Sequence, residues 1–166
     1  MSSRGAFVVS VATFGVVLAI AATELPDRVP MHFDATGSAD RWAGRTEAIV
    51  TFGLLGLFVG GLFGGIAAAT GRIPMSMVNV PHQHWWLAEP DRERRMRGLL
   101  RADMYWFAAT TMALLTIIVA LTLRASRLDK PHLDAWFWVS IGLYLAATFG
   151  YLFYCWRSRY RPEPEG

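Results

Sequence analysis

The sequence predicts an all-α membrane protein with four transmembrane helices. Of its 166 residues, 54% are hydrophobic, and the mean hydropathy is positive. The apolar residues gather in four long blocks free of charged side chains, and a helix needs about 20 apolar residues to cross a bilayer. A soluble domain would instead spread them at helical or strand period. We interpret residues 1–166 as a single integral membrane domain.

The first apolar block covers residues 6–23 and predicts a retained spanning helix. A cleaved signal peptide is the alternative, since Arg4 resembles a charged n-region and Ala19–Ala21 a cleavage site. The block is longer than the roughly 7–15 residues of a signal-peptide core, which favours retention.

The polar interval Leu25–Arg45 combines a strand pattern with a turn. Val29, Met31 and Phe33 alternate with less apolar residues, which predicts a short extended segment. Asp34 to Gly37 fits a type I turn, with Asp first and Gly fourth. This interval holds the residues that we expect to bind a partner: His32, Phe33, Asp34, Gly37, Asp40, Arg41 and Trp42.

The second block, residues 48–70, carries a stripe of small residues, with Thr46 and Glu47 suited to its N-terminus. Small residues four apart let another helix approach closely. The stripes of this block and of the fourth are Gly56, Gly60 and Gly64, and Gly142, Ala146 and Gly150. We expect these two helices to pack against each other, and homodimerisation or assembly into a larger membrane complex is the alternative.

The second polar interval, residues 71–103, is rich in arginine. Pro90 followed by Asp91 marks a helix start. Arginines and apolar residues share this helix, so we expect it to lie amphipathically at the lipid headgroups before the third span. A candidate motif precedes it, formed by Asn79, Pro81, Trp85 and Trp86.

The third and fourth blocks are residues 104–123 and 135–155, and a disordered tail is expected at 156–166. The four blocks contain no Asp, Glu, Lys, Arg or His, which disfavours an ion-coupled transporter acting alone. The fourth block ends at a thiol. That thiol, Cys155, is the single cysteine, so an internal disulfide and a multi-cysteine metal site are excluded.

The distribution of charge predicts the orientation. Ten arginines flank the blocks on the side of both termini, against six Lys and Arg on the other side, so the termini are expected in the cytoplasm. The outer stretch 24–47 has five acids against three arginines. The net charge of +3 is thus explained by membrane topology, with lipids as partners and no nucleic acid. Fifteen arginines against one lysine suggest a GC-rich bacterial genome.

Two motifs resemble a bacterial membrane family of unknown function. Leu25–Pro30 with His32-Phe33, Gly37 and Asp40–Trp42 is similar to the family's first motif, and Asn79–Pro81 with Trp86–Ala88 to a second. The best-known relatives are SdpI-type immunity proteins, which act against the sporulation-delaying-protein toxin. The resemblance implies an immunity or signalling role in a bacterial plasma membrane. Glu89 departs from the pattern, as an insertion ahead of Pro90.

Three functions remain open at this point. The leading hypothesis is a non-enzymatic protein without a cofactor, whose outer loop recognises a peptide or protein. An envelope or lipid-precursor enzyme, or its accessory subunit, is the second, and would need His32 with Asp34 or Asp40 as acid, base or zinc ligand. We instead expect these three side chains to have structural roles and no metal to bind there or at His82 and His84. A structural helix-packing subunit is the third.

Overall fold

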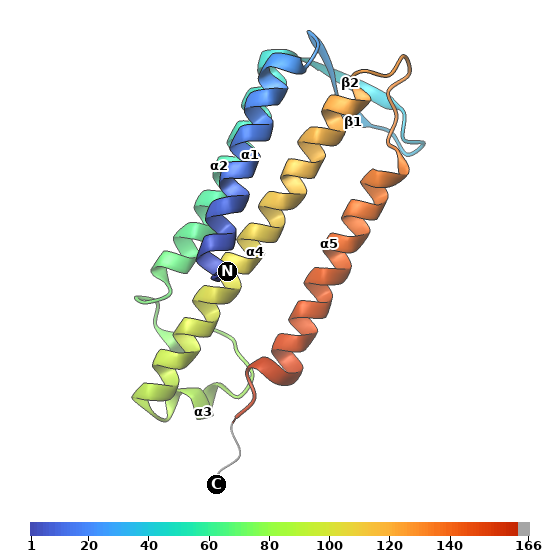
Figure 1. Cartoon of the computed structure of the whole chain (residues 1–166). Coiled ribbons are helices and arrows are strands. Elements are labelled where there is room, and N and C mark those ends of the chain that lie inside the picture. Colours follow the sequence, from blue (N-terminus) through green and yellow to red (C-terminus); the bar gives the residue numbers. More distant parts are fainter. Residues whose placement is uncertain (163–166) are drawn as a thin grey trace.

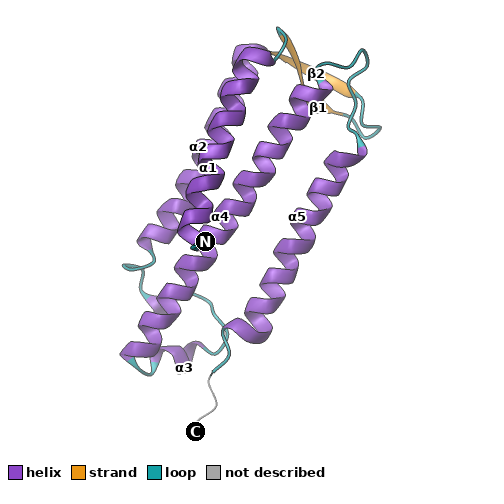
Figure 2. Ribbon diagram, viewed as in Figure 1, coloured by secondary structure: helices purple, strands orange, loops and turns teal. Residues whose placement is uncertain are grey.

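The computed structural model describes residues 1–162 and confirms the predicted fold class (Figures 1 and 2). The long helices are α1 (Ser3–Glu24), α2 (Arg45–Ala69), α4 (Pro90–Ala125) and α5 (Ala135–Tyr154). The strands β1 (Arg28–Phe33) and β2 (Ala39–Gly44) form one antiparallel hairpin between α1 and α2. A 3₁₀ turn (Met75–Met77) and the short helix α3 (Gln83–Leu87) lie between α2 and α4.

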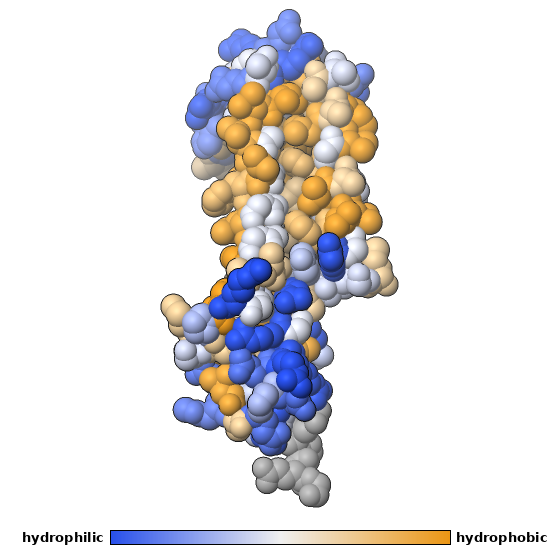
Figure 3. All heavy atoms as spheres, turned by 90° about the vertical axis from the view of Figure 1, so that its left-hand side faces the viewer, coloured by the Kyte–Doolittle hydropathy of each residue, from blue (hydrophilic) through white to orange (hydrophobic). Residues whose placement is uncertain are grey.

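Four helices are long and apolar enough to cross a membrane. On the face seen in Figure 3, mostly apolar side chains cover the middle of the molecule, and hydrophilic side chains gather at both ends. Very little of each candidate span is buried within the chain, and the fourth is not buried at all. Apolar surface that the chain does not cover itself is suited to lipid, so this is a multi-pass membrane protein.

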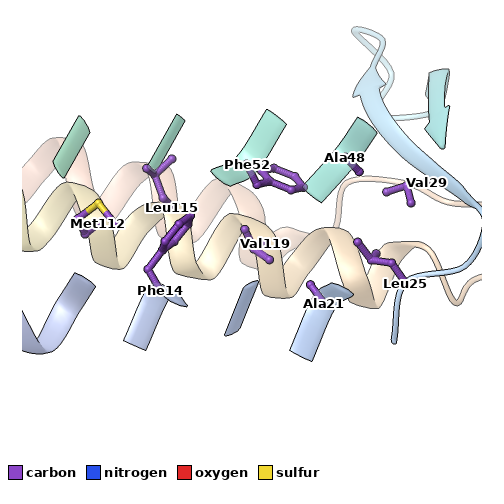
Figure 4. Packing of buried hydrophobic residues seen from close by; sticks show 9 residues of the cluster. All are labelled: Phe14, Ala21, Leu25, Val29, Ala48, Phe52, Met112, Leu115 and Val119. Carbon is purple, nitrogen blue, oxygen red and sulfur yellow. The ribbon is translucent and has the colours of Figure 1, made fainter. Parts of the chain in front are cut away.

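Helices α1, α2 and α4 form the core of the bundle (Figure 4). The most extensive packing is between α1 and α4. Phe14 of α1, Phe52 of α2 and Leu115 of α4 belong to one buried apolar cluster. Leu25 and Val29, at the ends of the α1–β1 connection, are 1% and 0% exposed. The hairpin, called the outer hairpin below after the orientation that the charge distribution predicts, is therefore fastened to the helical core by apolar side chains.

Among residues 1–162, α4 is the one long helix that α5 contacts appreciably. None of the residues of α5 is buried. The expected packing of the fourth block against the second is wrong. Gly56 and Gly64 instead face the rings of Phe14 and Phe7 on α1, and Gly60 lies nearest Met112 on α4. The α5 stripe is open, since a Cβ added at Gly142 or Gly150 would meet nothing within 4 Å. The four-residue spacing located the stripes of small residues. It could not show that side chains of α1 and α4, rather than α5, pack against the stripe on α2.

Several boundaries differ from the prediction. Helix α2 begins at Arg45 with Gly44 as its N-cap, so Thr46 is not the cap. The amphipathic helix and the third span are one continuous helix, α4, of 36 residues. This continuity has a physical reason, because the sequence between Pro90 and Ala125 contains no proline and a single glycine to interrupt it.

The tail expected to be disordered from Trp156 is partly ordered. Residues Cys155–Arg159 continue α5 as a π-helical turn, and Tyr160 is 4% exposed. Its order comes from contacts with residues far away in sequence, described below. Residues 163–166 of the expected tail lie outside the described residues.

Candidate functional sites at the two membrane faces

The tip of the outer hairpin is a turn held by one carboxylate. Gly37 N–H donates to the Asp34 carbonyl at 2.9 Å, as predicted, and Gly37 has a φ of 84° that suits glycine. Oδ1 of Asp34 accepts from the Thr36 hydroxyl at 2.6 Å and from the Ser38 N–H at 3.0 Å. These bonds hold the pKa of Asp34 below its usual value, the Thr36 hydroxyl having the largest effect. Asp34 therefore serves the turn.

The other predicted outer residues pair across the hairpin. His32 Nδ1 lies 2.6 Å from Asp40 Oδ1, and the Arg28 guanidinium lies 4.9 Å from the centre of the Trp42 ring. Arg41 is within 3.8 Å of Glu47. The strand that carries Asp40 to Trp42, β2, was not predicted as a strand. Its sequence, ADRWAG, has no β-branched residue, so its conformation depends on pairing with β1.

The hairpin is also tied to the connector between α4 and α5. Ser38 and His132 form a bridge in which Leu133 N–H donates to Gly37 O at 2.8 Å. Asp134 accepts from the N–H groups of Trp136 and Phe137 at the start of α5, and lies 3.3 Å from Arg124. These bonds join hairpin, connector and helix ends into one outer structure.

A cavity of about 380 Å³ lies beneath this outer structure. Its walls come from β1, α2, α4, the connector and the start of α5, and are mostly apolar. Of the predicted outer residues, only His32 and Phe33 line it. The lining residues are Pro30, Met31, His32, Phe33, Phe52, Ile118, Leu121, Thr122, Arg124, Ala125, Leu128, His132, Leu133, Asp134 and Phe137. Sequence spacing gave no indication of this cavity, because its walls are up to 107 positions apart, from Pro30 to Phe137.

The second motif lies at the opposite end of the bundle, in a small core of its own. Trp86 is 2% exposed and its indole N–H donates to the Tyr160 carbonyl at 3.1 Å. Trp85 is partly buried against this core, with Arg92 4.2 Å above its ring centre. Asn79 and Pro81 line an open groove of about 560 Å³, together with Val80, Leu100, Asp103, Met104, Phe107, Leu152, Cys155, Trp156 and Tyr160.

Asp103, which the sequence did not single out, is the centre of a buried polar cluster beside this groove. It is 3% exposed, and its carboxylate receives Arg159 at 2.7 Å, the Tyr151 hydroxyl at 2.8 Å and the Tyr160 hydroxyl at 2.6 Å. Burial and the bond to the carboxylate raise the pKa of Tyr160. Because α4 begins at Pro90, a buried carboxylate does occupy the third spanning helix, one residue before the block taken to be free of ionisable groups.

The geometry bears on the metal and enzyme hypotheses. His32 and Asp40 come together, but the Asp34 carboxylate is turned toward Thr36 and Ser38. Within residues 1–162, no three His, Cys, Asp or Glu side chains gather so that they could hold one metal ion. His82 and His84 are exposed, and His82 adopts a left-handed conformation at the start of α3.

Comparison with known proteins supports one part of the predicted resemblance. Residues 8–57 match the family model described as a domain of unknown function, DUF1648. The matched stretch contains most of α1, the whole hairpin and the first half of α2. No curated protein and no solved structure matches the chain.

Proposed function

We propose that this protein is a non-enzymatic recognition protein of the bacterial plasma membrane, with both termini in the cytoplasm. Its outer structure takes up an apolar side chain of a peptide or protein. One observation supports this most directly, namely the cavity of about 380 Å³ that the hairpin covers. Ligand sites are concave and mostly apolar, with a few convergent polar groups. An immunity or signalling role of the SdpI type is consistent with such a site.

The rim of the cavity offers groups that can orient a ligand. His32, Arg124 and His132 line it and present donors, while Asp134 provides an acceptor. Arg124 remains exposed although it pairs with Asp134. A peptide with an apolar side chain beside a backbone carbonyl or a carboxylate fits this combination, because charged donors form the stronger hydrogen bonds.

Filling the cavity is expected to abolish recognition. Ala125→Phe places a ring among the lining residues, whereas Ala120→Phe adds the same ring to an exposed position five residues earlier on α4. A partner would have to share the cavity with the new ring, and such overpacking costs about 1–3 kcal/mol. The amount of captured partner should therefore fall about tenfold or more with Ala125→Phe and should not change with Ala120→Phe. The measurement is affinity capture from native membranes, quantified by mass spectrometry against wild type.

Membrane level and melting temperature of both variants serve as controls for folding. Equal capture by Ala125→Phe and wild type would contradict a role for the cavity. In that event, alanine at Asp40 and Trp42 would test the outer surface of the hairpin instead, since Trp42 does not line the cavity.

The open stripe of α5 favours a second candidate, a helix-packing subunit. Gly142, Ala146 and Gly150 are exposed. A Cβ added at either glycine would meet nothing within 4 Å among residues 1–162. Small residues at this spacing allow close helix association in membranes. Association through α5 predicts that Gly142→Leu with Gly150→Leu changes the oligomeric state while Ala125→Phe does not.

A further inference from the structure

Five arginines at the end of the bundle that carries the termini have no carboxylate partner among residues 1–162. They occur next to all four spanning helices, and we refer to them as the basic collar: Arg4, Arg72, Arg101, Arg157 and Arg161. Other arginines of this end are neutralised. Arg97 lies 2.6 Å from Glu93, and Arg92 lies 3.0 Å from Glu89. The collar therefore consists of arginines without a carboxylate partner among residues 1–162, in contrast to the paired arginines beside it.

The outer end shows the opposite arrangement. Its arginines are engaged: Arg41 with Glu47, Arg45 with Asp27, Arg124 with Asp134, Arg127 with Glu24, and Arg28 over Trp42. Apart from Arg28, which stacks on a ring, the outer arginines have carboxylate partners, whereas the five arginines of the collar have none among residues 1–162. Surface cations attract anions within about a Debye length, roughly 8–10 Å at physiological ionic strength.

The Arg101 guanidinium lies beside the end of α2, next to the backbone that carries Arg72. A Cβ added to Gly71 would lie 3.3 Å from Nη2 of Arg101, so this guanidinium rests on the backbone beside Arg72. The carbonyls of Thr70 and Ile73 are already bonded to Arg97, at 2.8 and 2.9 Å. Arg101 is therefore available for an external anion, with a second cation adjacent in the chain.

Exposed apolar side chains accompany these cations. Met77, five residues after Arg72, is 78% exposed, and Trp156, directly before Arg157, is 64% exposed. An inorganic anion gives such side chains nothing to contact. A lipid surface contacts both kinds of group, because tryptophan is favoured at the headgroup level and arginine binds the phosphates.

We propose that the basic collar binds the headgroups of anionic phospholipids, with Arg72 and Arg101 as the principal contacts. The inference is independent of the outer cavity and goes beyond the proposed function. It assigns a lipid class to the membrane face opposite the hairpin.

The test measures lipid preference directly. Purified full-length protein in neutral detergent is given equimolar phosphatidylglycerol and phosphatidylcholine, and retained lipid is counted by native mass spectrometry. Wild type should prefer phosphatidylglycerol. A surface arginine contributes about fivefold, so Arg72→Gln with Arg101→Gln should lower that preference by about 25-fold. Arg41→Gln with Arg127→Gln removes the same charge at the outer end and should leave the preference unchanged.

Two further arms make the result decisive. Arg72→Lys with Arg101→Lys keeps the charge and should keep most of the preference, which separates charge loss from misfolding. Retained preference in the double glutamine variant would overturn the proposal. So would loss of bound phosphatidylglycerol on adding millimolar inorganic phosphate at constant ionic strength, because the site would then be one for a soluble anion.

Discussion

Replacing Asp103 by alanine is expected to lower the free energy of unfolding by about 3–5 kcal/mol, the usual cost of breaking a buried ion pair. The variant would leave the partly buried Arg159 without its carboxylate, and the Tyr160 hydroxyl without its acceptor. Both groups belong to the segment after α5, and their bonds to α4 hold that segment in place. The C-terminal segment should therefore be released in this variant.

Limited trypsin digestion distinguishes release of the segment from general unfolding. Cleavage after Arg157 and Arg159 should accelerate in Asp103→Ala at temperatures where the bundle remains folded. Asp129→Ala is the matched control, since Asp129 is exposed on the connector and its side chain forms no ion pair or hydrogen bond with residues 1–162. Unchanged digestion and melting temperature in Asp103→Ala would show that the cluster contributes little.

A double variant tests how much of the lost stability comes from the pair of Asp103 and Arg159. If Asp103 and Arg159 act as a pair, Asp103→Asn combined with Arg159→Gln should destabilise the protein by clearly less than the two single variants added together. Additive losses would instead indicate that the tyrosine hydroxyls and the packing around them supply the stability.

The sequence was sufficient for whatever depends on local composition. Length and hydropathy alone determine which segments can cross a bilayer, and all four predicted spans are long helices. The Asp34–Gly37 turn was predictable for the same reason, because its bonds join residues at most four apart. Strand β2 was not predictable in this way, because its residues have little local preference for a strand and its conformation depends on pairing with β1.

Long-range partners explain what the sequence could not provide. Asp103 follows Met96 and Leu100 along the apolar side of α4, and a carboxylate in that row is a signal of a buried charge. Its main partner, Arg159, is 56 positions away and lies in a segment expected to be disordered. The outer cavity is another example, because it exists only where the connector, hairpin and three helices meet.

Gly56→Leu is expected to be the second strongly destabilising change. A Cβ at this position would lie 2.6 Å from Cζ of Phe14, whose ring is 6% exposed in the centre of the core. Overpacking of this kind typically costs about 1–3 kcal/mol. The matched control is Gly61→Leu on the same helix, where a Cβ meets nothing within 4 Å. Thermal unfolding in a fixed detergent should show a lower melting temperature for Gly56→Leu only.

Combining Gly56→Leu with Phe14→Ala tests whether the ring is the cause. Phe14→Ala alone should cost about 3–5 kcal/mol by leaving a cavity, and the leucine at position 56 would extend into that space. The double variant should therefore be more stable than the sum of the two losses predicts. Strict additivity would contradict direct packing of Phe14 on Gly56.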